Sequence, residues 1–313
     1  MDELISLKSY PVHNTLRILL QDKTTKKNII WATNSYELQL GDDYDDKKQI
    51  TVGALTGLNP IELQPRILKN QEEQKKRTRI KAEVFTPAWI CNKMNNYCDE
   101  DWFKRKDVFN TEHDQSWETN PKKIEFDEPD DWKKYVDSRR LEITCGEAPF
   151  LASRYDASTG EFIPVQDRIG VLDRKLRIVN ENTAGKEEWL KWTYRAFQSV
   201  YGYEFQGDNL LIGRINLLMT FVEYYQDRWN ELPTVDELKK VANIISWNLW
   251  QMDGLSGRVP LGDPKEEIIQ PTLFDLLEED DEQEELELVG PKCKIYDWRR
   301  NNSVLYESLK GGI

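Results

Sequence analysis

The clearest hydrophobic pattern in the chain lies between residues 199 and 229. The run "SVYGYE" (199–204) has the composition of a strand, and a tight turn follows it. The next segment, "GDNLLIGRINLLMTFVEYYQDRW", places apolar side chains three or four positions apart, at Leu211, Ile215, Leu218, Val222, Tyr225 and Trp229. This spacing predicts a long helix with one apolar face and with Asp208 as its N-cap. Strand, turn and amphipathic helix together form a βα unit, which is typical of α/β proteins.

Three further segments have helical spacing. A helix is predicted in "KEEWLKWTYRAFQ" (186–198), and another in "TVDELKKVANIISWNLW" (234–250), where Thr234 and Glu237 have the spacing of a capping box. The third is expected to start at Pro87, because the apolar residues after it recur at helical intervals, at Trp89, Ile90, Met94 and Tyr97.

The remaining segments are assigned by composition. Short β-like runs in residues 1–60 predict a β-containing N-terminal extension, and residues 61–82 are read as a helix with a basic second half. Polar stretches at 99–138 and 157–185 are expected to be surface insertions, and 261–290 an acidic linker. The final segment, 291–313, contains a strand-like run "CKIYDW" (293–298).

Composition favours a folded protein without a membrane anchor. The chain has 313 residues, 39% of them hydrophobic and 11 of them tryptophan, so it can bury a core. No apolar run reaches the roughly 20 residues of a membrane span, and "MDELISLKSY" does not resemble a secretory signal. With four cysteines, no CxxC pair and two histidines, a structural zinc site is not expected, and the cytoplasm is the predicted location.

Charge is distributed unevenly. The net charge is −13, which argues against a general nucleic-acid coat. "EEDDEQEELE" (278–287) holds eight acidic residues, whereas residues 65–82 hold seven basic and two acidic ones. The basic run would either follow phosphates or form a solvated helix face.

A candidate site begins in "LEITCGEAPFL" (141–151). A β-type run carrying Glu142 meets the small residues Gly146 and Ala148, and an apolar "PFL" follows. A nucleotide-binding loop needs small residues where the backbone approaches the ligand, and an acid for the ligand's polar part. A plain turn between a strand and a helix has the same composition, so the loop alone leaves both interpretations open.

Three motifs together resemble the S-adenosylmethionine-dependent N6-adenine DNA methyltransferases, above all the modification subunits of type I and type IIG restriction systems. In that family an "FTP" segment precedes a loop "LDPxCGSGxFL", and a later strand ends in an acid as "YGxE" or "YGxD". This chain has Phe85-Thr86-Pro87, then residues 141–151, then "YGYE" ending in Glu204, in the same order. Glu142 replaces the aspartate of the loop, and Ala148 replaces its second glycine. The resemblance implies an α/β, Rossmann-like S-adenosylmethionine-binding domain over about residues 83–260.

The resemblance also implies roles for individual residues. Phe85, Thr86 and Pro87 would pack beside the methionine part of the cofactor. Glu142, Gly146 and Ala148 would surround its amino-acid end, and Glu204 would bind the ribose hydroxyls. Asp253 in "WQMDGL" would face the adenine ring; the alternative is a helix end capped by Gly254.

The catalytic motif of the family is absent. The family uses Asn-Pro-Pro-Tyr or -Phe to hold an extruded adenine, but the two Asn-Pro pairs of this sequence, at 59–60 and 120–121, are not followed by that motif. The sequence therefore predicts the cofactor-binding half of a split methyltransferase, completed by a second subunit that residues 291–313 contact by extending the open sheet. The alternative is a non-catalytic, methyltransferase-like subunit that binds DNA or protein. A third interpretation, an acidic DNA mimic, is disfavoured because the acidic run is short.

One linear motif remains. "QPTLF" (Gln270–Phe274) resembles the peptides that bind bacterial sliding clamps, although five residues match easily by chance. A linker helix is the alternative for this segment.

Overall fold

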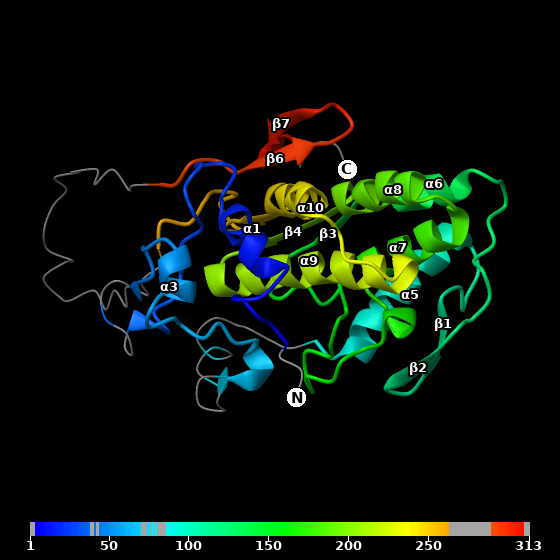
Figure 1. Cartoon of the computed structure of the whole chain (residues 1–313), viewed down its shortest axis with the longest axis horizontal. Helices are drawn as coiled ribbons and strands as arrows, with labels where there is room; N and C mark the ends of the chain where they lie inside the picture. Colours follow the sequence, from blue (N-terminus) through cyan, green and yellow to red (C-terminus); the bar gives the residue numbers. More distant parts are fainter. Residues whose placement is uncertain are drawn as a thin grey trace, which may run out of the picture.

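The centre of the molecule is a three-stranded parallel sheet. The computed structural model describes residues 4–37, 41, 44–69, 74–75, 77, 79, 86–262 and 289–309. Strands β3 (Arg140–Glu142), β4 (Val200–Glu204) and β5 (Leu249–Gln251) are hydrogen-bonded in the order β3-β4-β5, both pairs parallel. All five residues of β4 are buried, as expected for the middle strand of a parallel sheet. In Figure 1, β3 and β4 are drawn between the helices labelled α10 and α8 on one side and α9 on the other.

Four helices make the two crossover connections. Helices α7 (Val171–Asn182) and α8 (Lys186–Gln198) lead from β3 to β4, and α9 (Gly207–Trp229) and α10 (Val235–Asn248) lead from β4 to β5. The chain therefore contains a βαβαβ unit, which is one half of a doubly wound fold. The mixed α/β class expected from the sequence is confirmed, as are the strand and the three helices predicted between residues 186 and 250.

Helix α9 lies at the centre of the core. Its expected apolar face is buried except for Trp229, which is partly exposed. Most of its other residues up to Tyr225 are buried too, because the sheet, helices α7 and α10 and the N-terminal region surround it. The buried Arg214 donates hydrogen bonds to the backbone oxygens of Leu249 and Leu19. Helix α10 starts with the predicted capping box of Thr234 and Glu237.

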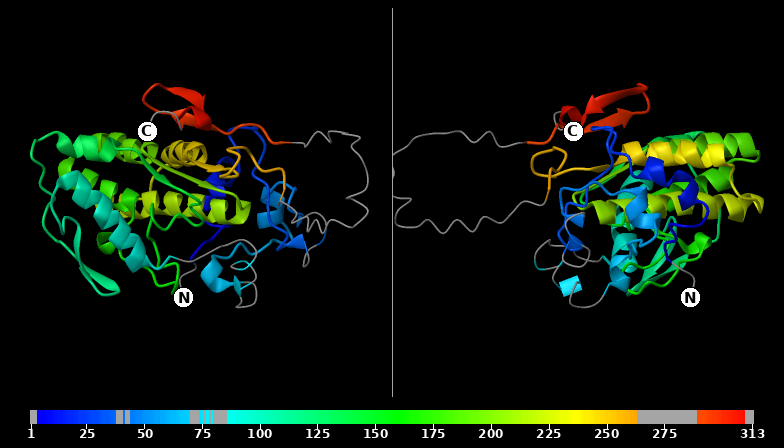
Figure 2. Two further views of the ribbon diagram at one scale, coloured as in Figure 1. Left: turned by 180° about the vertical axis from the view of Figure 1, so that it is seen from behind. Right: turned by 60° about the vertical axis from the view of Figure 1, so that its left-hand side comes forward.

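The opposite face of the sheet is covered by the C-terminal hairpin. Strands β6 (Lys294–Asp297) and β7 (Asn302–Leu305) pair antiparallel and are followed by the 3-10 helix η4 (Tyr306–Leu309). Ile295 packs in a cluster with Tyr201, Tyr203 and Trp250 from β4 and β5. The strand predicted in residues 293–298 is confirmed, but it pairs with β7 and does not extend the parallel sheet. In both views of Figure 2 this hairpin and the N-terminus lie on opposite sides of the molecule.

The N-terminal region corrects two expectations. The described part of residues 1–60 contains helices α1 (Val12–Leu19) and α3 (Val52–Thr56) and isolated bridges, with no strand. The run "TLRILL" is helical because Leu16 and Leu19 are buried where α1 packs against α10. Of the helix predicted over 61–82, residues 61–69 are non-helical apart from the 3-10 turn η2 (Arg66–Leu68), whereas the described residues of its basic second half, 74, 75, 77 and 79, are helical.

Helix α5 (Ala88–Phe103) buries a polar face, not the apolar face that was expected. Its inner face carries Asn92, Asn95, Asn96 and Asp99, whereas Met94 and Tyr97 are 55% and 76% exposed. The buried Arg174 of α7 explains this orientation, because its guanidinium donates to Asn92, Asn96 and Asp99. A polar helix face can be buried when each group finds such a partner.

The two expected surface insertions contribute to the core. Residues 99–138 contain the hairpin of β1 (Asn110–His113) and β2 (Ser116–Thr119) and helix α6 (Asp131–Asp137), whose Tyr135 and Val136 are buried. Residues 157–185 contain the 3-10 turn η3 (Val165–Asp167) and α7, which packs against α6, α8 and α9. In the first of these segments, Trp132 and Tyr135 are therefore packing residues.

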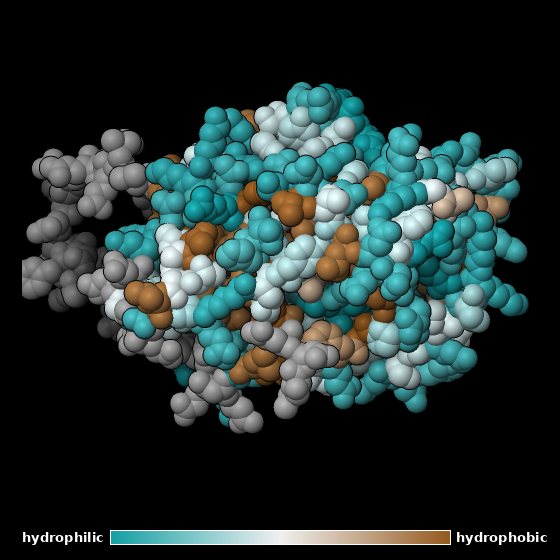
Figure 3. All heavy atoms as spheres, viewed as in Figure 1, coloured by the Kyte–Doolittle hydropathy of each residue, from teal (hydrophilic) through white to brown (hydrophobic). Residues whose placement is uncertain are grey.

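The exterior is largely polar. The face seen in Figure 3 is mostly hydrophilic, with separate apolar patches near its middle. Within the described residues, no helix combines the length and apolar character needed to cross a membrane.

Candidate functional site

The carboxyl ends of the three parallel strands bring the predicted acids to one edge. Glu142 ends β3 and Glu204 ends β4, while Asp253 follows the end of β5 by two residues. The register pairs Glu142 with Gly202 and Glu204 with Gln251. Ligands of open α/β sheets bind outside this edge.

The loop after β3 contacts the end of β4 directly. The backbone N–H of Gly146 donates to Glu204 Oε2 at 2.9 Å, and the N–H of Gln206 donates to Glu204 Oε1 at 3.1 Å. The N–H of Cys145 also donates to the carbonyl of Tyr203 at 2.8 Å. Gly146 and Glu204, which are 58 positions apart, are thus hydrogen-bonded neighbours.

The backbone of this loop has the conformation of a glycine-rich turn. Three residues of the loop have positive φ values: +48° at Thr144, +53° at Gly146 and +63° at Ala148. This left-handed region is common for glycine, but side-chain-bearing residues other than asparagine and aspartate seldom adopt it. A methyl group built on Gly146 would have no atom within 4 Å, so its backbone borders open space. On the other side, Gly213 of α9 allows close packing, since a methyl there would lie 3.1 Å from the Gly146 oxygen.

Glu142 is buried and mostly protonated at neutral pH. Its Oε1 accepts a hydrogen bond from the N–H of Phe150 at 3.3 Å, and its Oε2 has no partner among the described residues. Burial raises the pKa of Glu142 to about 8, although hydrogen bonds from the backbone of Phe150 and Leu151 oppose the shift; the nearby charge of Glu204 adds to it. A positively charged ligand placed here would favour ionisation of this carboxyl group.

Two residues of the "FTP" segment, Thr86 and Pro87, belong to the described part of the chain. Pro87 is the N-cap of α5 and not its first residue, and the Thr86 carbonyl accepts a weak hydrogen bond from Cys91 Sγ at 3.8 Å. Asn95 of α5 donates a hydrogen bond to the Phe150 carbonyl at 3.0 Å, which places α5 next to the loop that follows β3. Phe85 lies outside the described residues.

The carboxylate of Asp253 forms its hydrogen bonds within the turn that follows β5. It accepts hydrogen bonds from the N–H groups of Leu255 and Ser256 and from the Ser256 hydroxyl. Partial burial opposes ionisation of Asp253, but these hydrogen bonds outweigh it and lower its pKa. The alternative of a helix end capped by Gly254 is wrong, because strand β5 precedes this turn.

A buried charge cluster, which the sequence did not predict, stands beside Glu204. Asp208 accepts hydrogen bonds from Arg77 at 2.5 Å, from Lys69 at 3.2 Å and from the Tyr36 hydroxyl at 2.9 Å. Burial opposes ionisation of Asp208, yet the charges of Arg77 and Lys69 hold its pKa well below the usual range. Asp208 is therefore not the N-cap of α9, a position that Gln206 occupies.

The N-terminal extension closes part of this edge. Gln251 exchanges two hydrogen bonds of 2.9 Å with the backbone of Ile30, and Gly207 N–H donates to the Trp31 carbonyl. A side chain on Gly207 would place its Cβ 1.9 Å from the Ile30 oxygen, so only glycine fits there. The first turn of α9 is consequently packed against the chain itself, whereas the Gly146 loop borders open space.

The basic run 65–82 was the one sequence signal for this closure, and its interpretation holds only in part. Arg66, Lys69 and Arg77 are buried and neither follow phosphates nor form a solvated face, whereas Lys75 and Arg79 are exposed. Gln270–Phe274 and residues 278–287 lie outside the described residues. No group of histidine, cysteine and acidic side chains in the described part of the chain has an arrangement that could hold a metal ion.

Comparison with known proteins gives no relative. No family model, curated protein or solved structure matches this chain.

Proposed function

We propose that this chain is the S-adenosylmethionine-binding, or modification, subunit of a DNA adenine-N6 methyltransferase from a restriction–modification or phage-defence system. The observation that carries the proposal is the contact between the Gly146 N–H and Glu204, at the carboxyl ends of adjacent parallel strands. The resemblance of the sequence to that family predicts this meeting of loop and acid.

The backbone of the loop supports the same function. The family has glycines at the positions of Gly146 and Ala148, and both residues are left-handed here. Open space beside Gly146 allows a ligand to approach the backbone, while Gly213 lets the loop pack closely on α9. These are the separate tasks of glycines in dinucleotide-binding loops.

Each of these residues would bind a different part of the cofactor. Glu204 would accept hydrogen bonds from the ribose hydroxyls, in exchange for one of its present N–H donors. Glu142 would lie beside the ammonium group of the methionine part, with Thr86 and Pro87 nearby. Asp253 would need its turn to open before it contacted the adenine ring, so we assign it the smallest contribution.

A second subunit would supply the remaining functions. Because the sequence lacks Asn-Pro-Pro-Tyr or -Phe, another chain would hold the extruded adenine and recognise the DNA target. The sulfonium of the cofactor is itself the methyl donor, so this chain would mainly position it.

One observation favours the alternative, a non-catalytic methyltransferase-like subunit that binds DNA or protein. The first turn of α9 is covered by other parts of the chain, close to where a ribose would contact Glu204. The residues that contact it are Trp31, Tyr36, Lys69 and Arg77. This function requires the chain to bind its partners without binding the cofactor.

Calorimetric titration with S-adenosylmethionine separates the two functions. We expect saturable binding to the wild-type chain and loss of about 1–3 kcal/mol in Glu204→Gln, because an amide cannot accept both ribose hydroxyls as the carboxylate does. The matched control is Glu161→Gln, an exposed glutamate outside the site, which should bind like wild type. No heat and no thermal stabilisation at millimolar cofactor in any of the three proteins would rule out the cofactor site and leave the alternative.

A further inference from the structure

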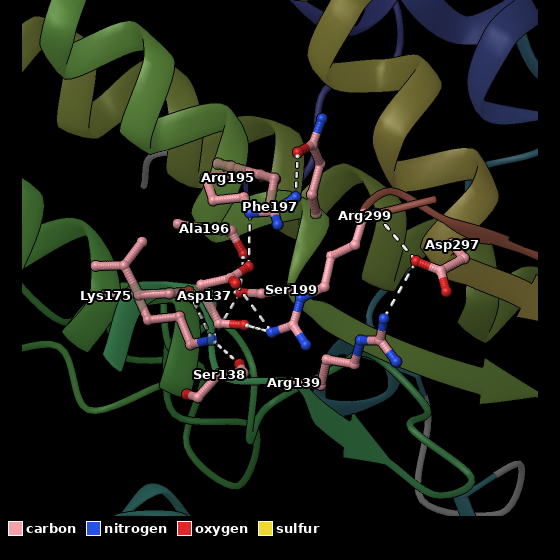
Figure 4. Close-up of polar contacts among 12 residues, drawn as sticks. Asp137, Ser138, Arg139, Lys175, Arg195, Ala196, Phe197, Ser199, Asp297 and Arg299 are labelled. Carbon is pink, nitrogen blue, oxygen red and sulfur yellow. Dashed lines mark hydrogen bonds and ion pairs between the residues drawn. The ribbon is translucent and has the colours of Figure 1, made fainter. Parts of the chain in front are cut away.

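The amino ends of β3 and β4 carry a cluster of arginines. Arg139, which precedes β3, contacts Asp297 at 3.1 Å, and Arg195 of α8 and Arg299 of the β6–β7 turn contact Asp137 at 2.6 and 2.9 Å. Figure 4 shows the guanidinium group of Arg139 directed at Asp297 and that of Arg299 directed at Asp137.

Positive charge exceeds negative charge in this cluster. Arg300 lies 3.9 Å from Asp297 and is 79% exposed, so four arginines share the two aspartates. Arg299 and Arg139 are also 45% and 42% exposed. In a protein of net charge −13, such a local excess of arginine attracts anions to one surface.

The support under the cluster is rigid. The buried Lys175 donates hydrogen bonds to the carbonyls of Val136 and Ser138 and to the Ser199 hydroxyl. These bonds fasten the turn between α6 and β3 to the start of β4. Arg139 of that turn and Asp137, the last residue of α6, are therefore held in place before any ligand arrives.

A groove runs along α8 beside the arginines, with Lys240 of α10 in its lining. Its volume is about 1040 Å³, and its lining includes Arg195 and Gln198 at the end near the cluster. Further along lie Lys191, Trp192, Tyr194 and Lys240, and Lys240 Nζ is 4.0 Å from the centre of the Tyr194 ring. The lining of the groove thus combines cationic and aromatic side chains.

Aromatic rings also flank the arginines on the side of the hairpin. Tyr296 lies 4.5 Å from Trp298 and 5.1 Å from Trp247 of α10, measured between ring centres, and all three are half-buried. In the lining of the groove, the acidic residues are Glu187 and Glu188, next to Gly185 and three to four residues before Lys191. Phosphate groups are therefore best accommodated at the Arg195 end.

We propose that this surface, from Lys240 and Tyr194 to Arg299 and Arg300, binds single-stranded nucleic acid. Arginines would hold the phosphates while unstacked bases contact the aromatic rings, a combination that proteins use to bind single strands. A duplex keeps its bases stacked and could use the arginines alone. The site lies at the opposite end of the sheet from Glu204, so it does not depend on the cofactor function.

Fluorescence anisotropy with a labelled oligothymidylate of about 20 nucleotides tests the proposal in the full-length chain. We expect the double variant Arg299→Gln/Arg300→Gln to bind at least tenfold more weakly and to reduce the slope of log K against log salt by about 1.4, the value for two lost phosphate contacts. Lys122→Gln/Lys123→Gln removes the same charge from an exposed segment outside this surface and should bind like wild type.

A second variant tests the aromatic contribution. Tyr194→Leu keeps the charge of the groove but removes a stacking surface, and we expect roughly tenfold weaker binding with the salt slope unchanged. Thermal unfolding of each variant establishes that it is folded. The proposal is overturned if wild type does not bind at low salt, if both double variants bind equally well, or if a polyglutamate peptide competes as effectively as the oligonucleotide.

Discussion

At the carboxyl ends of β3 and β4 the converging side chains are acids, Glu142 and Glu204, whereas arginines gather at the amino ends of the same strands. The acids are buried and lie next to a loop with three left-handed residues. The arginines are partly exposed and open onto a groove. Buried acids beside a loop that borders open space suit a small ligand, while an exposed basic and aromatic surface suits a polymer. The two binding functions that we propose would therefore lie at opposite ends of one short sheet.

The two ends also differ in how the chain itself covers them. At the carboxyl end, the N-terminal extension and the buried basic residues pack against α9 and meet at Asp208. At the amino end, the hairpin of β6 and β7 contributes Arg299 to the open surface. Contacts between distant segments therefore cover the carboxyl end of the sheet, whereas at the amino end they form the exposed arginine cluster.

The largest expected effect tests the closure of the carboxyl end. Asp208→Ala leaves Lys69 and Arg77 buried without their carboxylate, so we expect a loss of about 3–5 kcal/mol in the free energy of unfolding. Asp227→Ala, an exposed site on the same helix, should change it by less than about 0.5 kcal/mol. Urea denaturation measures both, and equal losses would show that the cluster does not hold the N-terminal region.

The pH dependence of this effect has a defined direction. The pKa of Asp208 is depressed in the folded state, so its stabilising contribution is complete above its unfolded pKa of about 4 and is lost as the pH falls further. The difference between wild type and Asp208→Ala should therefore narrow on acidification.

The next effect concerns Glu142. Because its pKa of about 8 exceeds the unfolded value, the folded state binds the extra proton between about pH 5 and 8. Wild-type stability should therefore fall over that interval by about 2–4 kcal/mol, and Glu142→Gln should remove this part of the fall. Denaturation curves at several pH values test this, with Glu161→Gln as control; parallel profiles for wild type and Glu142→Gln would contradict the burial argument.

A smaller effect tests the strain in the loop. Thr144 is exposed and left-handed, so Thr144→Gly should stabilise the protein by about 0.5–1 kcal/mol. Thr111→Gly in the exposed strand β1 should destabilise it by a similar amount, since glycine is disfavoured in strands. If Thr144→Gly also destabilises the protein in thermal unfolding, the left-handed backbone of this loop is in doubt.

The smallest expected effect is that of a substitution at one end of the sheet on ligand affinity at the other end. Arg299→Gln/Arg300→Gln should change the affinity for S-adenosylmethionine by no more than about twofold, because distant sites act additively. Glu204→Gln should likewise leave oligothymidylate binding within about twofold. Titrations of each variant with each ligand check this, and a large effect in either direction would merge the two surfaces into one site.

The sequence predicted those parts of the fold that depend on local pattern. Helices α8, α9 and α10 and strand β4 were found because their periodicity, capping box and composition are contained within each segment. The position of Glu204 beside the Gly146 loop followed from a resemblance of motifs, and the hydrogen bond between them agrees with it.

The errors arose where distant partners decide the structure. Helix α5 buries Asn92, Asn96 and Asp99 because Arg174, at least 75 positions away, satisfies them. Asp208 is bound by Arg77 and Tyr36, which are 131 and 172 positions distant. A single sequence gives no sign of such pairs, so an apolar pattern in α5 and a capping role for Asp208 were the simpler predictions.

Hydrogen–deuterium exchange with and without S-adenosylmethionine tests the central claim most directly, because it locates the ligand along the chain. The account predicts slower exchange in peptides covering residues 142–151 and 204–208, with no change in α8 or in the β6–β7 turn. Protection confined to α8, α10 and that turn, or no protection at saturating cofactor, would contradict a cofactor site at the carboxyl ends of β3 and β4.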